Sequence, residues 1–289
     1  MPDAMRVMPL LCAVIVAACG AADAAIPAPV TTTPETPTST PASWTLAWSD
    51  EFDGAAGTLP DATKWVMETG GGGWGNQELE NYTTSARNAS LDGTGNLAIV
   101  AREETSAGPC WYGACRYTSA RLKTQGKFAQ TYGRFEARLR IPAGQGMWPA
   151  FWMLGDDIDR NGWPKAGEID VMENIGKEPT VVHGTIHGPG YSGGNGISAS
   201  TALDAGAFAD DFHVYAVEWE PLVIRWLVDG RVYRTVTSSA LPPNTQWVYD
   251  HPFFILLNVA VGGAWPGSPD ASTRFPQQML VDYVRVYRR

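Results

Sequence analysis

Eight segments of the chain alternate apolar and polar residues with a period of two, which is typical of β-strands. They are rich in β-branched and aromatic residues and lie at 96–103, 133–141, 167–173, 181–187, 213–220, 223–236, 253–261 and 279–287. Turn signals separate them, and Asp229-Gly230 favours a β-hairpin. No long amphipathic helix interrupts the series. The pattern predicts an all-β fold, a two-sheet antiparallel β-sandwich of the jelly-roll type.

The beginning of the chain has the character of an export signal. Residues 1–25 contain the apolar run VMPLLCAVIVAA, which has the length of a signal peptide's apolar region and is too short for a permanent membrane span. Two processing sites compete: VAAC resembles a bacterial lipobox, in which Cys19 is lipidated, and ADA at 22–24 resembles a signal-peptidase site. We expect an exported protein, extracellular or anchored to the cell envelope as a lipoprotein through Cys19.

Residues 26–42 are rich in Pro and Thr and have almost no large apolar side chains, so they predict an extended linker. A single folded domain, expected to be monomeric, follows at 43–289. The net charge of −9 argues against nucleic acid as a partner, because phosphate binding needs a basic surface.

This domain contains one pair of cysteines, Cys110 and Cys115, in the stretch CWYGAC. In an exported protein they can form a disulfide. The alternative is a metal site, but two thiols without further Cys or His nearby make a poor zinc site.

The stretch GEIDVME at 167–173 places three acids within six residues of an otherwise apolar strand. On a regular strand Glu168 and Asp170 share a face, whereas Glu173 falls on the opposite face, in the core. An ionised carboxylate there would be costly. A β-bulge around 171–172 would return Glu173 to the face of the other two.

Three acids on one face suit glycoside hydrolysis. A retaining glycosidase uses two carboxyls about 5–5.5 Å apart, one ionised as the nucleophile and one protonated as the acid. Asp170 lies between the outer two, and its charge helps to keep the acid protonated. The acidic cluster alone also allows a calcium site or a solvated face.

The segments around these acids resemble glycoside hydrolase family 16, in its laminarinase-like branch. The matching segments are WSDEFDG (48–54), GMWPAFWML (146–154), GWPKAGEIDVMENIG (162–176), HGTIH (183–187), LLNVAVGGAWPG (256–267) and VDYVRVY (281–287). The resemblance implies Glu168 as nucleophile, Asp170 as assisting residue and Glu173 as general acid/base. The extra residue between Asp170 and Glu173 is similar to laminarinases.

The resemblance implies a retaining endo-β-1,3-glucanase with a concave substrate cleft, a β-glucan substrate and no cofactor for catalysis. A mixed-linkage glucanase or galactan hydrolase on the same fold is an alternative. A second alternative is a non-catalytic glucan-binding lectin.

Tryptophans lie close to the acids in sequence, and indole faces stack on pyranose rings. Trp152 and Trp163 could instead belong to the sandwich core. The resemblance implies Trp148 and Trp163 as a sugar-contacting pair and puts His187 beside Glu173. A metal pair of His183 and His187 would lack a third ligand.

The Gly-rich loop at 69–83 resembles the family segment that walls one side of the cleft. The predicted substrate contacts there are Trp74, Asn76, Glu80 and Asn81, and Asn258 is predicted as a further contact. The resemblance also implies a structural calcium ion held by Glu51, the carbonyl of Gly95 and Asp282, all oxygen donors as this ion prefers. Without the resemblance, Glu51 and Asp282 are ordinary surface acids.

Overall fold

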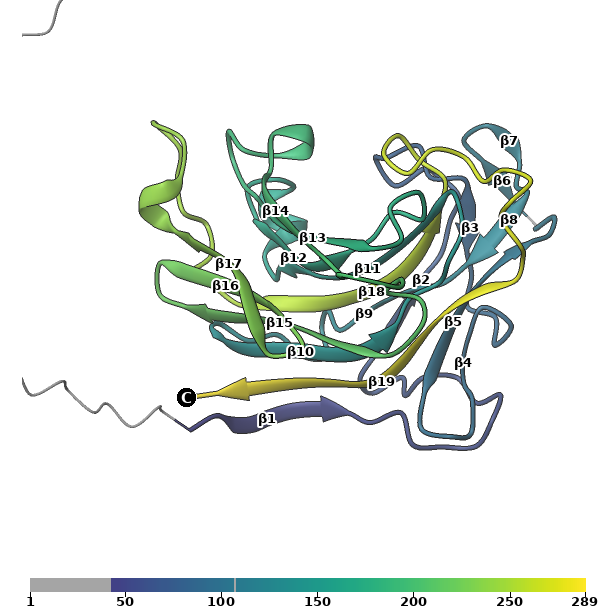
Figure 1. Ribbon diagram of the computed structural model, residues 1–289, viewed down its shortest axis with the longest axis horizontal. Coiled ribbons are helices and arrows are strands. Elements are labelled where there is room, and N and C mark those ends of the chain that lie inside the picture. The colour runs from purple at the N-terminus through teal and green to yellow at the C-terminus, as the bar shows by residue number, and fades with distance from the viewer. Residues whose placement is uncertain (1–42, 107) are drawn as a thin grey trace, which may run out of the picture. The chain divides into compact units, whose positions relative to one another are not determined.

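The computed structural model describes residues 43–106 and 108–289. They form two large sheets that lie one above the other (Figure 1). The larger sheet has ten strands: in spatial order β17 (Arg231–Thr237), β16 (Val223–Val228), β15 (His213–Glu220), β10 (Gly133–Arg140), β19 (Gln277–Arg288), β5 (Leu97–Glu103), β8 (Tyr117–Ser119) and β3 (Glu80–Tyr82), with β1 (Thr45–Asp50) beside β19 and β4 (Ala89–Leu91) beside β5.

The smaller sheet carries the three acids. Its seven strands are, in spatial order, β14 (Ile197–Ala202), β13 (Val181–His187), β12 (Glu168–Glu173), β11 (Met147–Gly155), β18 (Phe253–Val261), β9 (Arg121–Lys123) and β2 (Val66–Glu68). A separate hairpin joins β6 (Pro109–Cys110) to β7 (Gly113–Ala114). The two-sheet β-sandwich predicted from the sequence is confirmed.

The eight predicted segments are all strands, and 223–236 is the predicted hairpin, turning at Asp229-Gly230 where both residues have positive φ. Strand β11, at the centre of the smaller sheet, is missing from the prediction. Both faces of β11 carry apolar side chains, so the alternation of apolar and polar residues that marks a half-exposed strand is weak there.

The core lies between the two sheets. Along β18 every residue is buried, and alternate side chains from Phe253 to Val261 belong to the main core cluster. The side chains between them, Asn258 among them, point to the other face of the sheet. On β11, Trp148 and Trp152 share that face, while Phe151 packs into the core. We call the face of the smaller sheet that is turned away from the larger sheet the concave face.

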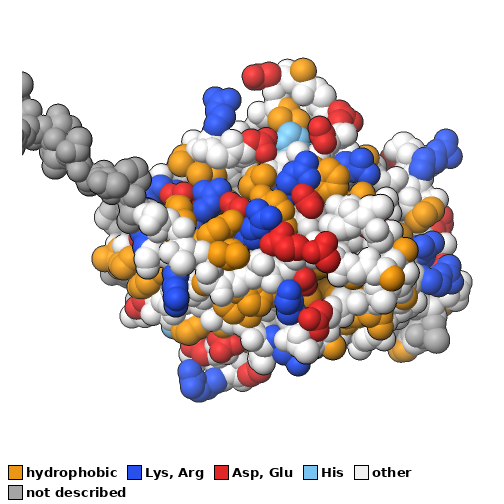
Figure 2. Space-filling view, turned by 90° about the horizontal axis from the view of Figure 1, so that it is seen from below, with side chains coloured by type: hydrophobic (Ala, Val, Ile, Leu, Met, Phe, Trp, Pro, Cys, Tyr) orange, Lys and Arg blue, Asp and Glu red, His pale blue; other side chains and the backbone are white. Residues whose placement is uncertain are grey.

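The outer face of the larger sheet carries acidic and basic side chains side by side (Figure 2). Several of them are paired, such as Arg134 with Glu136 and Glu218 at 2.7 and 2.9 Å.

Helical structure within 43–106 and 108–289 is confined to short turns, namely α1 (Ile158–Asn161), η1 (Gly193–Asn195) and η2 (Ser238–Ala240). None of the helices in this part of the chain has the length and apolar character needed to cross a membrane.

Candidate active site

Strand β12 contains the β-bulge that the spacing of its acids predicts. On the neighbouring strand β11, successive residues pair with Asp170 and Met172, so Val171 has no partner of its own. Both Val171 and Met172 are buried in the core. The extra residue shifts the alternation by one step, and Glu173 returns to the face that carries Glu168 and Asp170.

Two tryptophans hold the outer acids. The indole Nε1 of Trp163 donates to Oε2 of Glu168 at 2.7 Å, and Nε1 of Trp148 donates to Oε1 of Glu173 at 3.0 Å. Trp163 is half exposed, so its ring borders the open side of the site and is not part of the core. An N–H donor favours the ionised form of a carboxyl, so each outer acid has a partner for its charged state.

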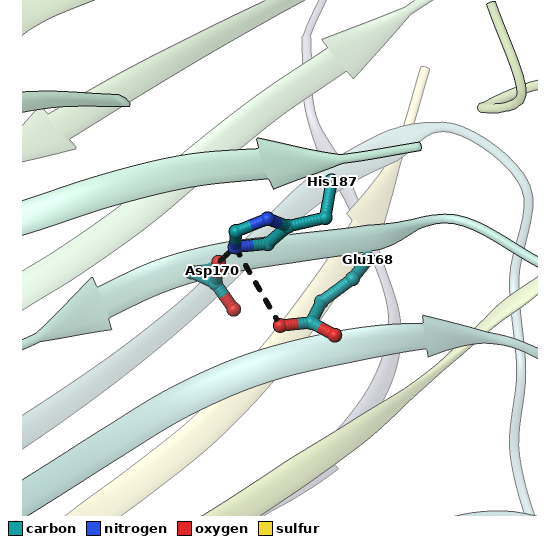
Figure 3. Close-up of side chains that lie close together, drawn as sticks. All are labelled: Glu168, Asp170 and His187. Atoms are coloured by element: carbon teal, nitrogen blue, oxygen red, sulfur yellow. Dashed lines mark ion pairs between the residues drawn. The ribbon is translucent and has the colours of Figure 1, made fainter. Parts of the chain in front are cut away.

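Asp170 is the most buried of the three acids and lies beside His187 (Figure 3). His187 Nε2 is 3.1 Å from Oδ2 of Asp170 and 3.9 Å from Oε1 of Glu168. The backbone carbonyl of Asp170 accepts a hydrogen bond from Nε1 of Trp226 at 2.8 Å. These contacts fix the middle acid from two sides.

The expectation that His187 lies beside Glu173 is wrong. In the register of β12 with β13, His187 is opposite Glu168, and His183 is opposite Glu173. His183 turns to Glu178, with Nε2 at 3.3 Å from Oε2, so the two histidines do not form a metal pair. Donor atoms of Glu168, Asp170 and His187 do lie within 4.8 Å of one another and could hold a metal ion.

Burial raises the pKa of all three acids. Burial and then the charge of Asp170 raise the pKa of Glu168 to about 8, and burial raises the pKa of Asp170 to about 7. Burial and then the charges of Asp170 and Glu168 raise the pKa of Glu173 well above its ordinary value. The cluster therefore keeps part of its protons at neutral pH, which a general acid requires.

Glu168→Gln should raise the melting temperature by about 10 °C at pH 8 and leave it unchanged near pH 4. The unfolded chain releases this proton near the ordinary pKa of 4.5, whereas the folded protein keeps it until about pH 8. The stability that Glu168 contributes is thus present at low pH and is lost as pH rises through this interval. Glutamine has no proton to lose.

Thermal unfolding at pH 4, 6 and 8 measures this difference. Glu103→Gln, at the exposed end of β5, is the matched control, because it removes a carboxyl from the surface. A difference between Glu168→Gln and the parent that stays constant across the three pH values would contradict the prediction.

Trp152 belongs to the concave face, where its Nε1 donates to Oδ1 of Asn258 at 2.7 Å. Asn258 in turn donates from Nδ2 to the hydroxyl of Tyr82 at 3.2 Å. The guanidinium of Arg121 lies 4.7 Å from the ring centroid of Trp152 and 4.6 Å from that of Trp74. The predicted contacts Trp74, Trp152 and Asn258 are therefore brought into one group.

Two residues of this face, Arg121 and Trp265, were not predicted from the sequence. Arg121 comes from a three-residue strand, and nothing local to it shows that it is enclosed by aromatic rings from two distant segments. Trp265 packs edge-on against Trp148 at 5.5 Å and against His183 at 5.0 Å, near the Glu173 end of β12. Trp265 lies within the segment LLNVAVGGAWPG, one of those that resemble the family, so its aromatic side chain could have been predicted as part of the site.

The polar residues of the Gly-rich loop do not all face the acids. Asn76 donates from Nδ2 to Oε1 of Glu78 at 3.0 Å. Glu80, expected as a substrate contact, is fully buried and accepts the Val261 N–H at 2.6 Å, so that expectation is wrong. Burial raises the pKa of Glu80 well above its ordinary value.

Asn81 follows Glu80 on β3, and its side chain therefore points to the opposite face of that strand. Its Nδ2 donates to Oγ of Ser106 at 3.0 Å. It lines a hollow of about 480 Å³, together with Thr69, Gly70, Gly71, Tyr82, Thr83, Thr84, Ser106, Gly108 and Pro109. The structure does not bring Asn81 together with the three acids, and its role in substrate binding stays a prediction.

The structure joins Cys110 to Cys115 by a disulfide, the pairing expected from the sequence. The bond closes the β6–β7 hairpin. This hairpin lies against the Gly-rich loop, because Gly71 forms a β-bridge with Cys110. The disulfide therefore helps to hold the Gly-rich loop in place.

Two of the predicted calcium ligands, Glu51 and Asp282, have carboxylates that are already paired. Both oxygens of Glu51 accept hydrogen bonds from Arg285, at 3.0 and 2.8 Å. Asp282 accepts one from Arg138 at 2.6 Å. As placed, the set does not fit a calcium ion, because guanidinium groups occupy the oxygens that would bind it. Calcium stays a prediction and has no part in the chemistry below.

Comparisons with known proteins agree with this geometry. The model of the family Glycosyl hydrolases family 16 matches residues 76–285. The Beta-glucanase of Rhodothermus marinus is 46% identical over 252 residues, 85% of each chain. The Glucan endo-1,3-beta-glucosidase A1 of Niallia circulans is 40% identical over 266 residues, which are 84% of this chain but 38% of that longer protein.

A solved structure shows the same likeness in three dimensions. The laminarinase catalytic domain from Thermotoga maritima matches with a TM-score of 0.80 and 47% sequence identity, covering 85% of this chain and 98% of that one. The fold, the acids of β12 and these matches lead to one conclusion: the chain belongs to glycosyl hydrolase family 16 and is a glycoside hydrolase.

Proposed function

We propose that this glycoside hydrolase is an endo-β-1,3-glucanase that cleaves internal bonds of laminarin-type β-glucans with retention of configuration. The observation that carries the proposal is the bulge of β12, which puts Glu168, Asp170 and Glu173 on one face. The linkage is supported by the names of the two relatives and of the solved structure, a beta-glucanase, a glucan endo-1,3-beta-glucosidase and a laminarinase.

The first step forms a glycosyl-enzyme. Glu168 reacts in its ionised form, which the nearby His187 and the Trp163 N–H favour. An oxygen of this carboxylate attacks the anomeric carbon, the bond to the leaving oxygen breaks, and Glu173 donates its proton to that oxygen. The Trp163 N–H keeps Glu168 oriented at 2.7 Å. Asp170 lies beside Glu168 on the same face of β12, and His187, 3.1 Å from Asp170, positions it.

The second step releases the product. Glu173, now a carboxylate, removes a proton from a water molecule whose oxygen attacks the anomeric carbon, and the bond to Glu168 breaks. Two inversions at the same carbon give net retention. The Trp148 N–H at 3.0 Å stabilises the negative charge that Glu173 carries between the two steps.

Product analysis tests the activity and the linkage together. The domain at 43–289 is incubated with laminarin, lichenan and agarose, and ¹H NMR records the anomer formed first. We expect β-1,3-linked oligosaccharides of several lengths, with the β-anomer first. Preference for lichenan or agarose would support a mixed-linkage glucanase or a galactan hydrolase, and binding of laminarin without cleavage would support a lectin.

We also propose that the chain is exported and tethered through lipidated Cys19. Residues 1–42, which hold the predicted signal, the linker and Cys19, lie outside the described residues. The proposal is supported by the VAAC motif and the polar segment that follows it. Incorporation of labelled palmitate by the full chain, but not by Cys19→Ser, is the expected result.

A further inference from the structure

Trp111 is a large apolar residue that the fold leaves half exposed, at 51%. Among the described residues only two tryptophans have this much exposure, and the other one, Trp163, contacts Glu168. A half-exposed indole ring offers a flat apolar face on which a pyranose ring can stack.

The ring of Trp111 is fixed in spite of its exposure. Its Nε1 donates to the carbonyl of Glu78 at 2.7 Å, and its backbone N–H donates to the carbonyl of Gly71 at 2.9 Å. One edge of the ring lies against Gly73, where an added Cβ would come within 2.8 Å of Cδ1. Gly73 also has a φ of +78°, a backbone conformation that favours glycine. Both this conformation and the contact with the ring therefore disfavour a larger residue at position 73.

The hairpin that carries Trp111 is held as firmly as the ring. The Cys110–Cys115 disulfide closes it, and the hydroxyl of Tyr112 donates to the carbonyl of Leu79 at 2.6 Å. Figure 1 shows β6 and β7 at the upper rim of the fold, on the side of β3 and across from β14 and β17. A side chain held in this way keeps its orientation without a ligand, so binding costs little conformational entropy.

A row of side chains leads from the acids to the Gly-rich loop, on which the hairpin packs. Asp170 pairs in register with Trp152 on β11, and Arg121 lies between the rings of Trp152 and Trp74. The row crosses β11, β18 and β9 towards β2. Strand β2 lies four strand spacings from β12, or about 19 Å. Trp74 is a member of the Gly-rich loop, and Trp111 packs on the same loop: their indole N–H groups donate to the carbonyls of Gly70 and Glu78.

We propose that Trp111 is a distal sugar-stacking platform, which binds units of a β-glucan chain beyond those held at the acids. The inference rests on the proposed function for the nature of its ligand. It assigns the disulfide hairpin a role in binding long chains, and it predicts that the platform contributes nothing to oligosaccharides too short to reach it.

Affinity for chains of different length tests the platform. Trp111→Ala and Trp111→Phe are made in the inactive Glu168→Gln protein, and dissociation constants are measured for laminarin and for the β-1,3-linked trisaccharide. We expect Trp111→Ala to bind laminarin about tenfold more weakly and the trisaccharide unchanged within about twofold. Trp111→Phe should keep most of the affinity. Leu46→Ala, 51% exposed on β1 of the other sheet, is the matched control.

Two results would overturn the platform. An unchanged affinity of Trp111→Ala for laminarin would show that the ring does not contact the chain. An equal loss for laminarin and the trisaccharide would show that Trp111 only supports the Gly-rich loop.

The proposed function is judged separately, by hydrolysis with the active parent. If the parent prefers lichenan or agarose, the β-1,3 assignment fails, and the same comparison of long and short chains of that polysaccharide decides the platform. If the parent hydrolyses laminarin while the Glu168→Gln protein binds none of the three polysaccharides, the proposed function stands and the platform alone is overturned.

Discussion

Glu168→Ala should lower kcat for β-glucan hydrolysis by about 10⁴-fold or more, because the first bond to the anomeric carbon can no longer form. The loss should appear in kcat more than in KM, since Trp148 and Trp152, the predicted sugar contacts, remain. Initial rates of reducing-sugar release from laminarin, measured at equal protein concentration, give both constants.

Azide distinguishes a lost nucleophile from a damaged fold. The shortened side chain leaves room beside Trp163 for a small anion, which can attack an activated aryl β-glucoside from the side that Glu168 occupied. We expect a glycosyl azide of inverted, α configuration, and no such product with the parent. Hydrolysis by Glu168→Ala at more than about a hundredth of the parental rate would exclude Glu168 as nucleophile.

Glu173→Ala should lower kcat on laminarin by about 10²–10⁴-fold, because the leaving sugar then departs without a proton. An aryl glucoside with a strongly acidic phenol does not need that proton, so its first step should be nearly normal. The second step lacks its base, and the glycosyl-enzyme should accumulate. A burst of phenol in stopped-flow measurements, together with a mass increase of one glycosyl unit, detects it.

Added azide again gives a diagnostic product in Glu173→Ala. It needs no base, attacks the glycosyl-enzyme and should form the β-glycosyl azide, with retained configuration. Glu173→Gln is the matched variant, since it keeps the size of the side chain and its contact with Trp148. Equal losses on laminarin and on the aryl glucoside would rule out an acid/base role for Glu173.

The bulge and the common face of the acids could be predicted because they follow from a local rule. Strict alternation would bury the charge of Glu173, and one extra residue is the smallest change that avoids it. The shared face of Trp148 and Trp152 also follows from their spacing of four along β11, but β11 itself was not predicted as a strand, so only the structure shows it. Such features depend only on neighbours in the chain.

Features that depend on partners from elsewhere in the chain could not be predicted. The position of His187 opposite Glu168 is set by the register of β13, which the residues of β12 do not encode. Arg121 is enclosed by rings from β11 and the Gly-rich loop. Arg285 and Arg138 pair with Glu51 and Asp282 through contacts between strands far apart in sequence.

All three acids come from one strand, β12, which is paired on both sides by β11 and β13. Their spacing therefore does not depend on how the rim loops are held or on how the two sheets lie against each other. Moderate heating that loosens the rim would weaken the capture of a glucan chain and leave the chemical step intact. The temperature at which affinity is lost is therefore set by the rim loops, and the temperature at which catalysis is lost is set by the central sheet.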